Sequence, residues 1–153
     1  MAPTFYRISG LLDIEYIAQK TVVIIGTGSL GSAVARVMAY PWKLLVLIDP
    51  DKLGPENIER HQLGYTSVGR YKAPAMRRQL IRDRGLDGDR IVAHRTTAEQ
   101  VLERYGDADL VIETTGNLPL RSLINDWCYE NNVPVIFAGV YPKGTGGEIV
   151  VLG

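Results

Sequence analysis

An apolar run that leads directly into a glycine-rich loop and then into a helix limits the folds that are open to this chain. Residues 21–25 carry apolar side chains on both faces, as a strand in the middle of a sheet requires. The loop Gly26-Thr-Gly28-Ser-Leu-Gly31 follows, and residues 29–39 are spaced as a helix that ends before Pro41. Glycines permit a tight turn and a close approach of the backbone, and the N-terminus of a helix attracts anions. The segment therefore predicts a phosphate-binding loop, with a packing turn that binds no ligand as the alternative.

Short apolar runs and amphipathic stretches alternate along the rest of the chain, a pattern typical of βαβ units. The sequence predicts a three-layer, Rossmann-like α/β domain with a doubly wound, mainly parallel sheet and the first strand at its centre. The ligand is expected at the carboxyl ends of the strands, between the first and the fourth. Further strands are expected at residues 44–48, 91–93, 109–113, 134–137 and 148–153, and helices at 72–84, 98–105 and 118–131.

The two ends of the chain suggest its domain organisation. Residues 1–20 are interpreted as a helical lead-in, with a short helix at 11–18, and residues 21–153 as the nucleotide-binding domain. The glycine-rich stretch 143–147 is expected to be a hairpin turn near the ligand. Because the last residues have the pattern of a strand rather than of a polar tail, we expect this domain to be part of a longer protein.

Composition excludes several classes of function. Seventeen Lys and Arg balance seventeen Asp and Glu, so net charge gives no argument for binding nucleic acid or an anionic membrane. Cys128 is the single cysteine and there are two histidines, which rules out an internal disulfide and argues against a structural zinc site. Cys128 is expected to be a buried helix residue. We also see no signal peptide and no apolar stretch long enough to span a bilayer, so we expect a cytoplasmic protein.

Candidate nucleotide-binding residues follow the first two strands. The phosphates are expected at the loop and helix start, that is at Gly26, Gly28, Ser29, Leu30 and Gly31. Asp49 ends the second strand, where a carboxylate can accept hydrogen bonds from ribose hydroxyls. To this point NAD, FAD and ATP fit the sequence equally well.

The polar segment after the second strand favours ATP. It carries Asn57 and Arg60, and Lys72 begins the next helix. A triphosphate that reacts at its α-phosphorus needs bases around the leaving pyrophosphate, and Arg60 and Lys72 can supply them. The alternative is that both are ordinary surface bases in water.

These residues together resemble the ThiF/MoeB/HesA-type adenylyltransferase family, whose fold is shared with ubiquitin-activating enzymes. The resemblance implies binding of ATP and Mg²⁺ and attack on the α-phosphorus by the C-terminal carboxylate of a ubiquitin-like or sulfur-carrier protein. It implies that Asp49 contacts the ribose, that Asp51 belongs to the same site, that Asn57, Arg60 and Lys72 contact the triphosphate, and that the protein is a homodimer. The matching segments are residues 26–31, 47–51, 57–60, 68–72, 109–112 and 121–128, and residues 57–61 also resemble the branch found in bacterial ubiquitin-like conjugation gene clusters.

The chain departs from this family at one residue that matters for chemistry. Gly116 stands where the family commonly has a metal-binding aspartate, and glycine has no side chain to coordinate a cation. Asp51 or Glu113 could replace that aspartate, magnesium could be held by phosphates and water, or the domain could bind nucleotide without catalysis. An NAD- or FAD-dependent oxidoreductase is a third possibility, although the sequence offers no clear hydride-site residue. His61 is expected to be a solvated loop residue.

Overall fold

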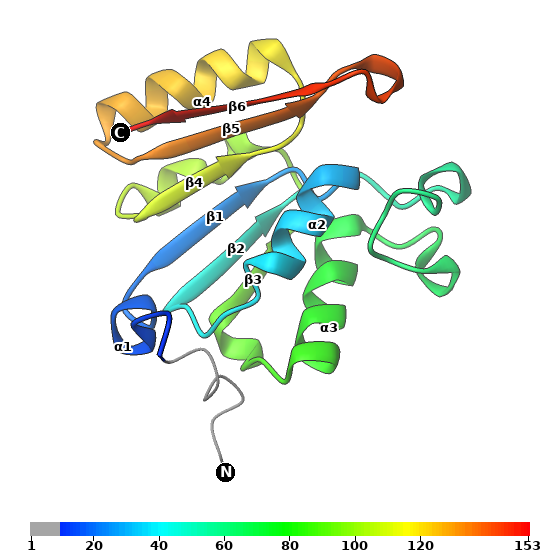
Figure 1. The fold of residues 1–153 in the computed structure, drawn as a ribbon, viewed down its shortest axis with the longest axis horizontal. Coiled ribbons are helices and arrows are strands. Elements are labelled where there is room, and N and C mark those ends of the chain that lie inside the picture. Colours follow the sequence, from blue (N-terminus) through cyan, green and yellow to red (C-terminus); the bar gives the residue numbers. More distant parts are fainter. Residues whose placement is uncertain (1–9) are drawn as a thin grey trace.

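The computed structural model describes residues 10–153, which form a six-stranded sheet with helices on both faces (Figure 1). The strand order is β3-β2-β1-β4-β5-β6, and all neighbours are parallel except β5 and β6. The predicted doubly wound α/β fold with a central first strand is therefore confirmed. The strands are β1 (Thr21–Ile25), β2 (Leu44–Ile48), β3 (Ile91–His94), β4 (Leu110–Glu113), β5 (Val135–Val140) and β6 (Gly147–Leu152), and the helices are α1 (Ile14–Ile17), α2 (Ser29–Val37), α3 (Lys72–Arg84) and α4 (Leu118–Glu130).

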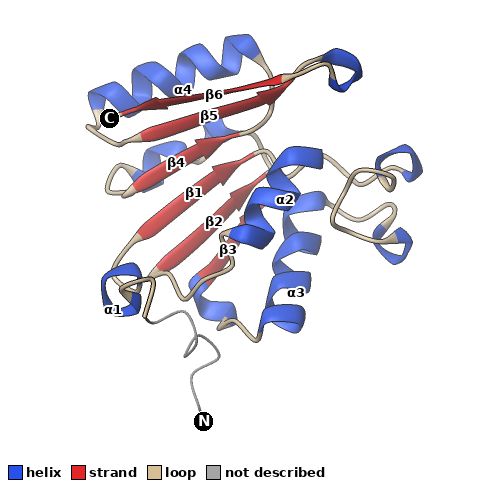
Figure 2. Cartoon of the chain, viewed as in Figure 1, coloured by secondary structure: helices blue, strands red, loops and turns tan. Residues whose placement is uncertain are grey.

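Two hydrophobic cores, one on each face of the sheet, hold the layers together. Alternate residues of β1 divide between them: Val23 and Ile25 pack toward α4, and Val22 and Ile24 pack toward α2 and α3. All five residues of β1 are buried, which is why the strand is apolar on both faces. Figure 2 shows α2 and α3 over one face of the sheet and α4 beside β4, β5 and β6.

The ends of the helices follow local chemistry. The α4 helix begins after Asn117, whose side-chain oxygen accepts a hydrogen bond from the Leu120 N–H at 3.1 Å. The α3 helix ends at Gly85, which adopts the left-handed conformation that glycine tolerates best. Both helices therefore start and stop near the residues that the sequence predicts.

Two sequence predictions of helix were wrong in detail. Residues 98–105 form two 3₁₀ turns, η5 (Ala98–Gln100) and η6 (Leu102–Tyr105), because Val101 at φ −132° breaks the helical repeat and is buried in the core. The helix expected at residues 11–18 is confined to α1. Residues 1–9 of the predicted lead-in lie outside the described residues, and the division at residue 20 stays a prediction.

The predicted hairpin connects β5 to β6. It contains the 3₁₀ turn η7 (Pro142–Gly144), and Lys143 and Gly144 both have positive φ angles, of 60° and 68°. None of the helices in the described part of the chain is both long enough and apolar enough to cross a membrane.

Candidate nucleotide-binding site

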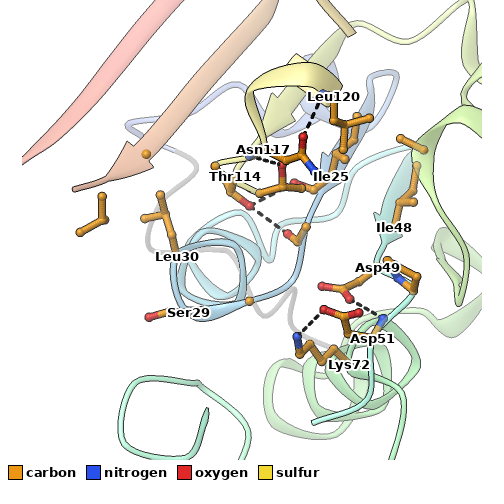
Figure 3. Close-up of a pocket in the computed structure, with 18 of the residues that line it drawn as sticks. Ile25, Ser29, Leu30, Ile48, Asp49, Asp51, Lys72, Thr114, Asn117 and Leu120 are labelled. Atoms are coloured by element: carbon orange, nitrogen blue, oxygen red, sulfur yellow. Dashed lines mark hydrogen bonds and ion pairs between the residues drawn. The ribbon is translucent and has the colours of Figure 1, made fainter. Parts of the chain in front are cut away.

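A cleft of about 1370 Å³ lies beyond the carboxyl ends of the strands, at the switch between β1 and β4. Pockets for one small ligand usually measure about 300–1,000 Å³, so the cleft is larger than one small ligand needs. Figure 3 shows Asp49, Asp51 and Lys72 on one side of it and Thr114 and Asn117 on the other. The lining includes Gly26, Gly28, Ser29 and Leu30 of the glycine loop, Arg60 of the polar segment, Gly116 after β4, and Tyr141 to Gly144 of the hairpin.

The three motif glycines are in different surroundings. Gly26 has a φ of +85°, and a side chain on it would contact Thr115. A Cβ on Gly31 would lie 2.0 Å from the Gly26 carbonyl oxygen, so the start of α2 can pack on the loop only without a side chain there. A Cβ on Gly28 would meet nothing within 4 Å, and Gly28 lines the cleft. The backbone at Gly28 is therefore open to a phosphate, whereas Gly26 and Gly31 shape the turn.

Asp49 fixes the glycine loop to the end of β2. Its Oδ2 atom accepts hydrogen bonds from the N–H of Thr27 at 2.7 Å and from the Thr27 hydroxyl at 3.1 Å. Its Oδ1 atom accepts from the N–H of Asp51 at 2.8 Å. Asp49 is 4% exposed but lines the cleft, so the ribose contact predicted for it would use the acceptor capacity that remains.

Lys72 lies at the beginning of α3 and points into the cleft. Its Nζ atom is 3.0 Å from Oδ2 of Asp51, and the side chain is only 12% exposed. The Asp51 side chain is 66% exposed, so the ion pair joins a largely buried lysine to a carboxylate at the surface of the cleft. The structure therefore brings Lys72, Asp51 and the glycine loop together, as the sequence predicts.

The polar loop, residues 52–71, is closed at its base by hydrogen bonds between Leu53 and residues 69 and 70. Arg60 lines the cleft, and its carbonyl oxygen accepts a hydrogen bond from the Ser29 hydroxyl at 3.0 Å. Asn57 is not among the residues that line the cleft, and its side-chain oxygen accepts the Gly54 N–H at 3.0 Å. Arg60 therefore belongs to the lining of the cleft, whereas Asn57 stabilises the turn.

The prediction that His61 is a solvated loop residue was wrong. The side chain is 9% exposed and bonded to the glycine loop, with Nε2 2.6 Å from the carbonyl oxygen of Thr27. Burial lowers the pKa of His61, and the charge of Lys72 adds to this effect, while the Thr27 bond and Asp49 oppose it. The pattern Arg60-His61-Gln62 gave no apolar signal of a buried histidine.

Sequence reasoning expected the hairpin 143–147 near the ligand but did not single out Lys143, which is a third cation in the lining. It missed a second part of the lining, Thr97, Ala98 and Glu99, which follow β3. The residues of η5 were hidden because the segment was assigned to a helix.

Comparison with known proteins identifies the family. The model of the ThiF family matches residues 4–152, almost the whole chain. The chain belongs to the ThiF family. It is 32% identical over 143 residues to the sulfur carrier protein ThiS adenylyltransferase of Escherichia coli, covering 90% of this chain and 55% of that protein. It is 29% identical over 129 residues to the sulfur carrier protein adenylyltransferase of Thermus thermophilus, covering 83% of this chain and 48% of that protein.

Solved structures of similar proteins share the fold of this ThiF domain. E. coli MccB, in a crystal structure with succinimide, superposes with a TM-score of 0.76 at 20% identity, covering 92% of this chain and 46% of that one. PaaA superposes with a TM-score of 0.72 at 24% identity, covering 84% of this chain and 40% of that one. The chain thus spans about half the length of the relatives that it matches.

At the position of the family's metal-binding aspartate, this ThiF domain has no carboxylate. Gly116 lines the cleft at a φ of +68° and offers no carboxylate. Glu113 is fully buried, accepts hydrogen bonds from Thr115, and forms an ion pair with Arg121 at 3.1 Å, so its oxygens are occupied. No group of three or more His, Cys, Asp or Glu side chains suited to a metal occurs among residues 10–153. Of the two possible replacements for the missing aspartate, only Asp51 lines the cleft.

Arg121 of α4 links the elements that lie behind the cleft on the side of β4. Its Nε atom faces Glu113 and a terminal nitrogen bonds Glu148 of β6, which joins three elements behind the cleft. The guanidinium also lies over the Phe137 ring, 5.5 Å from its centre. Arg121 therefore has a structural role here. Cys128 is buried on the same helix as predicted, and burial raises the pKa of its thiol to about 11.

Proposed function

We propose that this ThiF domain binds ATP and activates the C-terminal carboxylate of a ubiquitin-like or sulfur-carrier protein as an acyl adenylate. The observation that carries the proposal is that Lys72 and Arg60 line the same cleft as the open backbone at Gly28. A dinucleotide needs little beyond the glycine loop for its pyrophosphate, whereas a triphosphate needs further positive charge. The names of the relatives, which are adenylyltransferases of sulfur carrier proteins, support the same reaction.

In the proposed complex, the phosphates lie against the Gly28 backbone and the first-turn N–H groups of α2. Asp49 accepts a hydrogen bond from the ribose, and Lys72 exchanges its pairing with Asp51 for a phosphate oxygen. Arg60 approaches the phosphates from the polar loop. All of these residues line the same cleft, which supports the proposed contacts.

The proposed reaction is a displacement at the α-phosphorus. A carboxylate oxygen of the protein substrate forms a bond to this phosphorus, and the bond from phosphorus to the oxygen bridging to the β-phosphate breaks. Pyrophosphate leaves with the negative charge, which Arg60 and Lys72 stabilise. No enzyme nucleophile is needed, because the substrate carboxylate is the nucleophile and the site supplies positioning and charge.

The magnesium that the family resemblance implies would be held mainly by phosphate oxygens and water, with Asp51 as the available carboxylate. The partner and assembly are proposals of the same kind: a sulfur-carrier or ubiquitin-like protein as substrate, and a homodimer. The relatives are about twice as long, so their remaining length is where further substrate contacts are to be sought.

Pyrophosphate exchange into ATP tests the reaction directly. The longest native form of the protein should be assayed with magnesium, in the presence and absence of a carrier protein that ends in a free carboxylate. We expect exchange that depends on that carboxylate, and a carrier whose C-terminus is amidated is the matched control. Exchange that is equal with both carriers would contradict adenylation of the C-terminus.

A second candidate function is nucleotide binding without catalysis, as a scaffold. The glycine at position 116 favours it, because that residue leaves the β4 side of the cleft without a carboxylate. ATP binding by the native protein without any pyrophosphate exchange, with every carrier tested, would favour this function over the first.

A further inference from the structure

His61 is buried between the polar loop and the glycine loop, and both of its ring nitrogens are bonded. Nδ1 accepts a hydrogen bond from the N–H of Leu63 at 3.0 Å, so this nitrogen carries no proton. Nε2 therefore carries the proton and donates it to the Thr27 carbonyl oxygen, at 2.6 Å. The ring is neutral and holds a single orientation.

The residues on either side of His61 are fixed to the same part of the fold. The carbonyl oxygen of Arg60 accepts a hydrogen bond from Ser29, and the N–H of Gln62 donates to the Ser32 hydroxyl at 3.2 Å. Three consecutive residues of the polar loop are thus bonded to the glycine loop and the first turn of α2. His61 is the middle one, and its contact is shorter than the two that flank it.

The partner of His61 connects the two functional parts of the cleft. Thr27 is fully buried, and its N–H and hydroxyl both donate to Asp49. The His61 imidazole therefore bonds the Thr27 carbonyl. The N–H of the same threonine bonds Asp49, the carboxylate that is predicted to bind ribose. One continuous set of hydrogen bonds runs from the loop of Arg60 through His61 and Thr27 to Asp49.

We propose that His61 is a positioning residue that fixes Arg60 over the phosphate end of the cleft. This inference rests on the proposed binding of ATP. His61 does not line the cleft, and neither nitrogen is free to accept a proton from a substrate, so it acts through Arg60 and Thr27. Small errors in the placement of such a group cost much of its effect, because charge-assisted hydrogen bonds depend on geometry.

The test compares three variants by calorimetric titration of ATP and AMP at about pH 8, well above the usual histidine pKa. His61→Leu removes both hydrogen bonds and should weaken ATP binding about tenfold, the effect of losing one or two such bonds, with a smaller effect on AMP. His61→Gln keeps a donor and an acceptor and should restore most of the loss. His94→Leu removes the other histidine, which bonds Tyr105 and not the polar loop, and should leave both affinities unchanged.

A second measurement stands even if His61→Leu does not fold. Protonation of His61 would replace the Nδ1 acceptor by a donor facing the Leu63 N–H, so the polar loop should loosen in acid. The pKa of His61 is lowered in the fold, so its stabilisation is full above the ordinary value of 6.5 and is lost as pH falls through the folded value. The charged groups that act on it are Lys72 and Asp49. The protection of the backbone amides at residues 57–63, taken relative to their intrinsic exchange rates at each pH, should fall in acid more in the wild type than in His61→Gln.

The outcomes separate this inference from the proposed function. If wild-type protein binds ATP but His61→Leu binds it equally well, or loses ATP and AMP affinity to the same extent, the positioning role is wrong and ATP binding stands. If wild-type protein binds no ATP, the proposed function fails, and the hydrogen-exchange comparison alone decides whether His61 holds the polar loop. Equal acid sensitivity in the wild type and His61→Gln would overturn that role.

Discussion

The two sides of the cleft are built differently. On the side of β1 and β2, buried polar groups bond one another: Asp49 holds Thr27, and His61 holds the polar loop against it. On the side of β4 and β5, Gly116 and the hairpin around Lys143 line the cleft, and the ion pairs of Arg121 lie behind it. The first side is thus held by a set of buried hydrogen bonds, as the proposed nucleotide site requires, whereas a glycine and a hairpin line the second. The proposed reaction uses this division, with the nucleotide on the first side and the carboxylate of the protein substrate on the second.

Loss of the ion pair between Arg121 and Glu113, behind the β4 side of the cleft, should have the largest effect on stability. Arg121→Met leaves the fully buried Glu113 without its cation, and losing one partner of a buried pair costs about 3–5 kcal/mol of unfolding free energy. Chemical denaturation measures the loss. The double variant Glu113→Gln/Arg121→Met should recover much of it, because the charge that then lacks Arg121, on Glu148, is 37% exposed rather than fully buried. A single variant as stable as the wild type would show that the pair does not support this side.

The glycine loop provides a matched pair on the other side. Gly31→Ala forces a Cβ against the Gly26 carbonyl oxygen and should cost about 2–3 kcal/mol of stability, as overpacking does. Gly28→Ala meets nothing in the protein and should change stability by less than about 0.5 kcal/mol. It should nevertheless weaken ATP binding, since its methyl group occupies the approach of a phosphate. Thermal unfolding and ATP titration of both variants check this, and similar behaviour of the two would contradict the roles assigned to the glycines.

Lys72 and Arg60 should strengthen ATP binding through the β- and γ-phosphates. Lys72→Ala and Arg60→Ala should each weaken ATP binding by about 1.5–2 kcal/mol, roughly ten- to thirtyfold, as expected for lost charge-assisted hydrogen bonds. AMP lacks the β- and γ-phosphates and should lose less. Asp51→Asn is the control for the ion pair of Lys72, and it should not weaken ATP binding in the absence of magnesium. Equal losses for ATP and AMP would remove the role assigned to both cations.

Only a small loss of stability is expected at position 116, where the family commonly has a carboxylate. Gly116→Asp should cost only about 0.5–1 kcal/mol of stability, because aspartate tolerates the left-handed conformation better than most residues and a Cβ there has open space. If the β4 side lacks only a metal ligand, the variant should increase magnesium-dependent pyrophosphate exchange. If the folded variant exchanges pyrophosphate at the wild-type rate, a missing metal ligand does not explain the difference between the two sides of the cleft.

The predictable parts of this molecule are those with a regular period. The bounds of β1, β2 and α3 agree with the apolar spacing of the sequence, and the placement of the glycine loop follows from the strand before it. Because the carboxyl ends of parallel strands meet at one edge of a sheet, the sequence alone was enough to place Asp49 and Gly28 in one cleft.

The parts that could not be predicted depend on contacts between distant residues. His61 is buried because the carbonyl of Thr27 in the glycine loop accepts its hydrogen bond, and no local pattern indicates a partner 34 positions away. Glu113 is unavailable as a metal ligand because of Arg121, which lies on the next helix. The break at Val101 follows from burial of that side chain in the core rather than from its helix propensity. Tertiary contacts therefore determine the burial of His61, the pairing of Glu113 and the break at Val101.

Every role assigned to the cleft depends on its holding a nucleoside triphosphate, with Lys72 and Arg60 at the outer phosphates. Titration calorimetry of the wild-type protein with ATP, AMP and NAD is the decisive experiment. We expect ATP to bind more tightly than AMP, and NAD to bind most weakly, because only ATP presents outer phosphates to both cations. Tighter binding of NAD than of ATP would contradict this assignment.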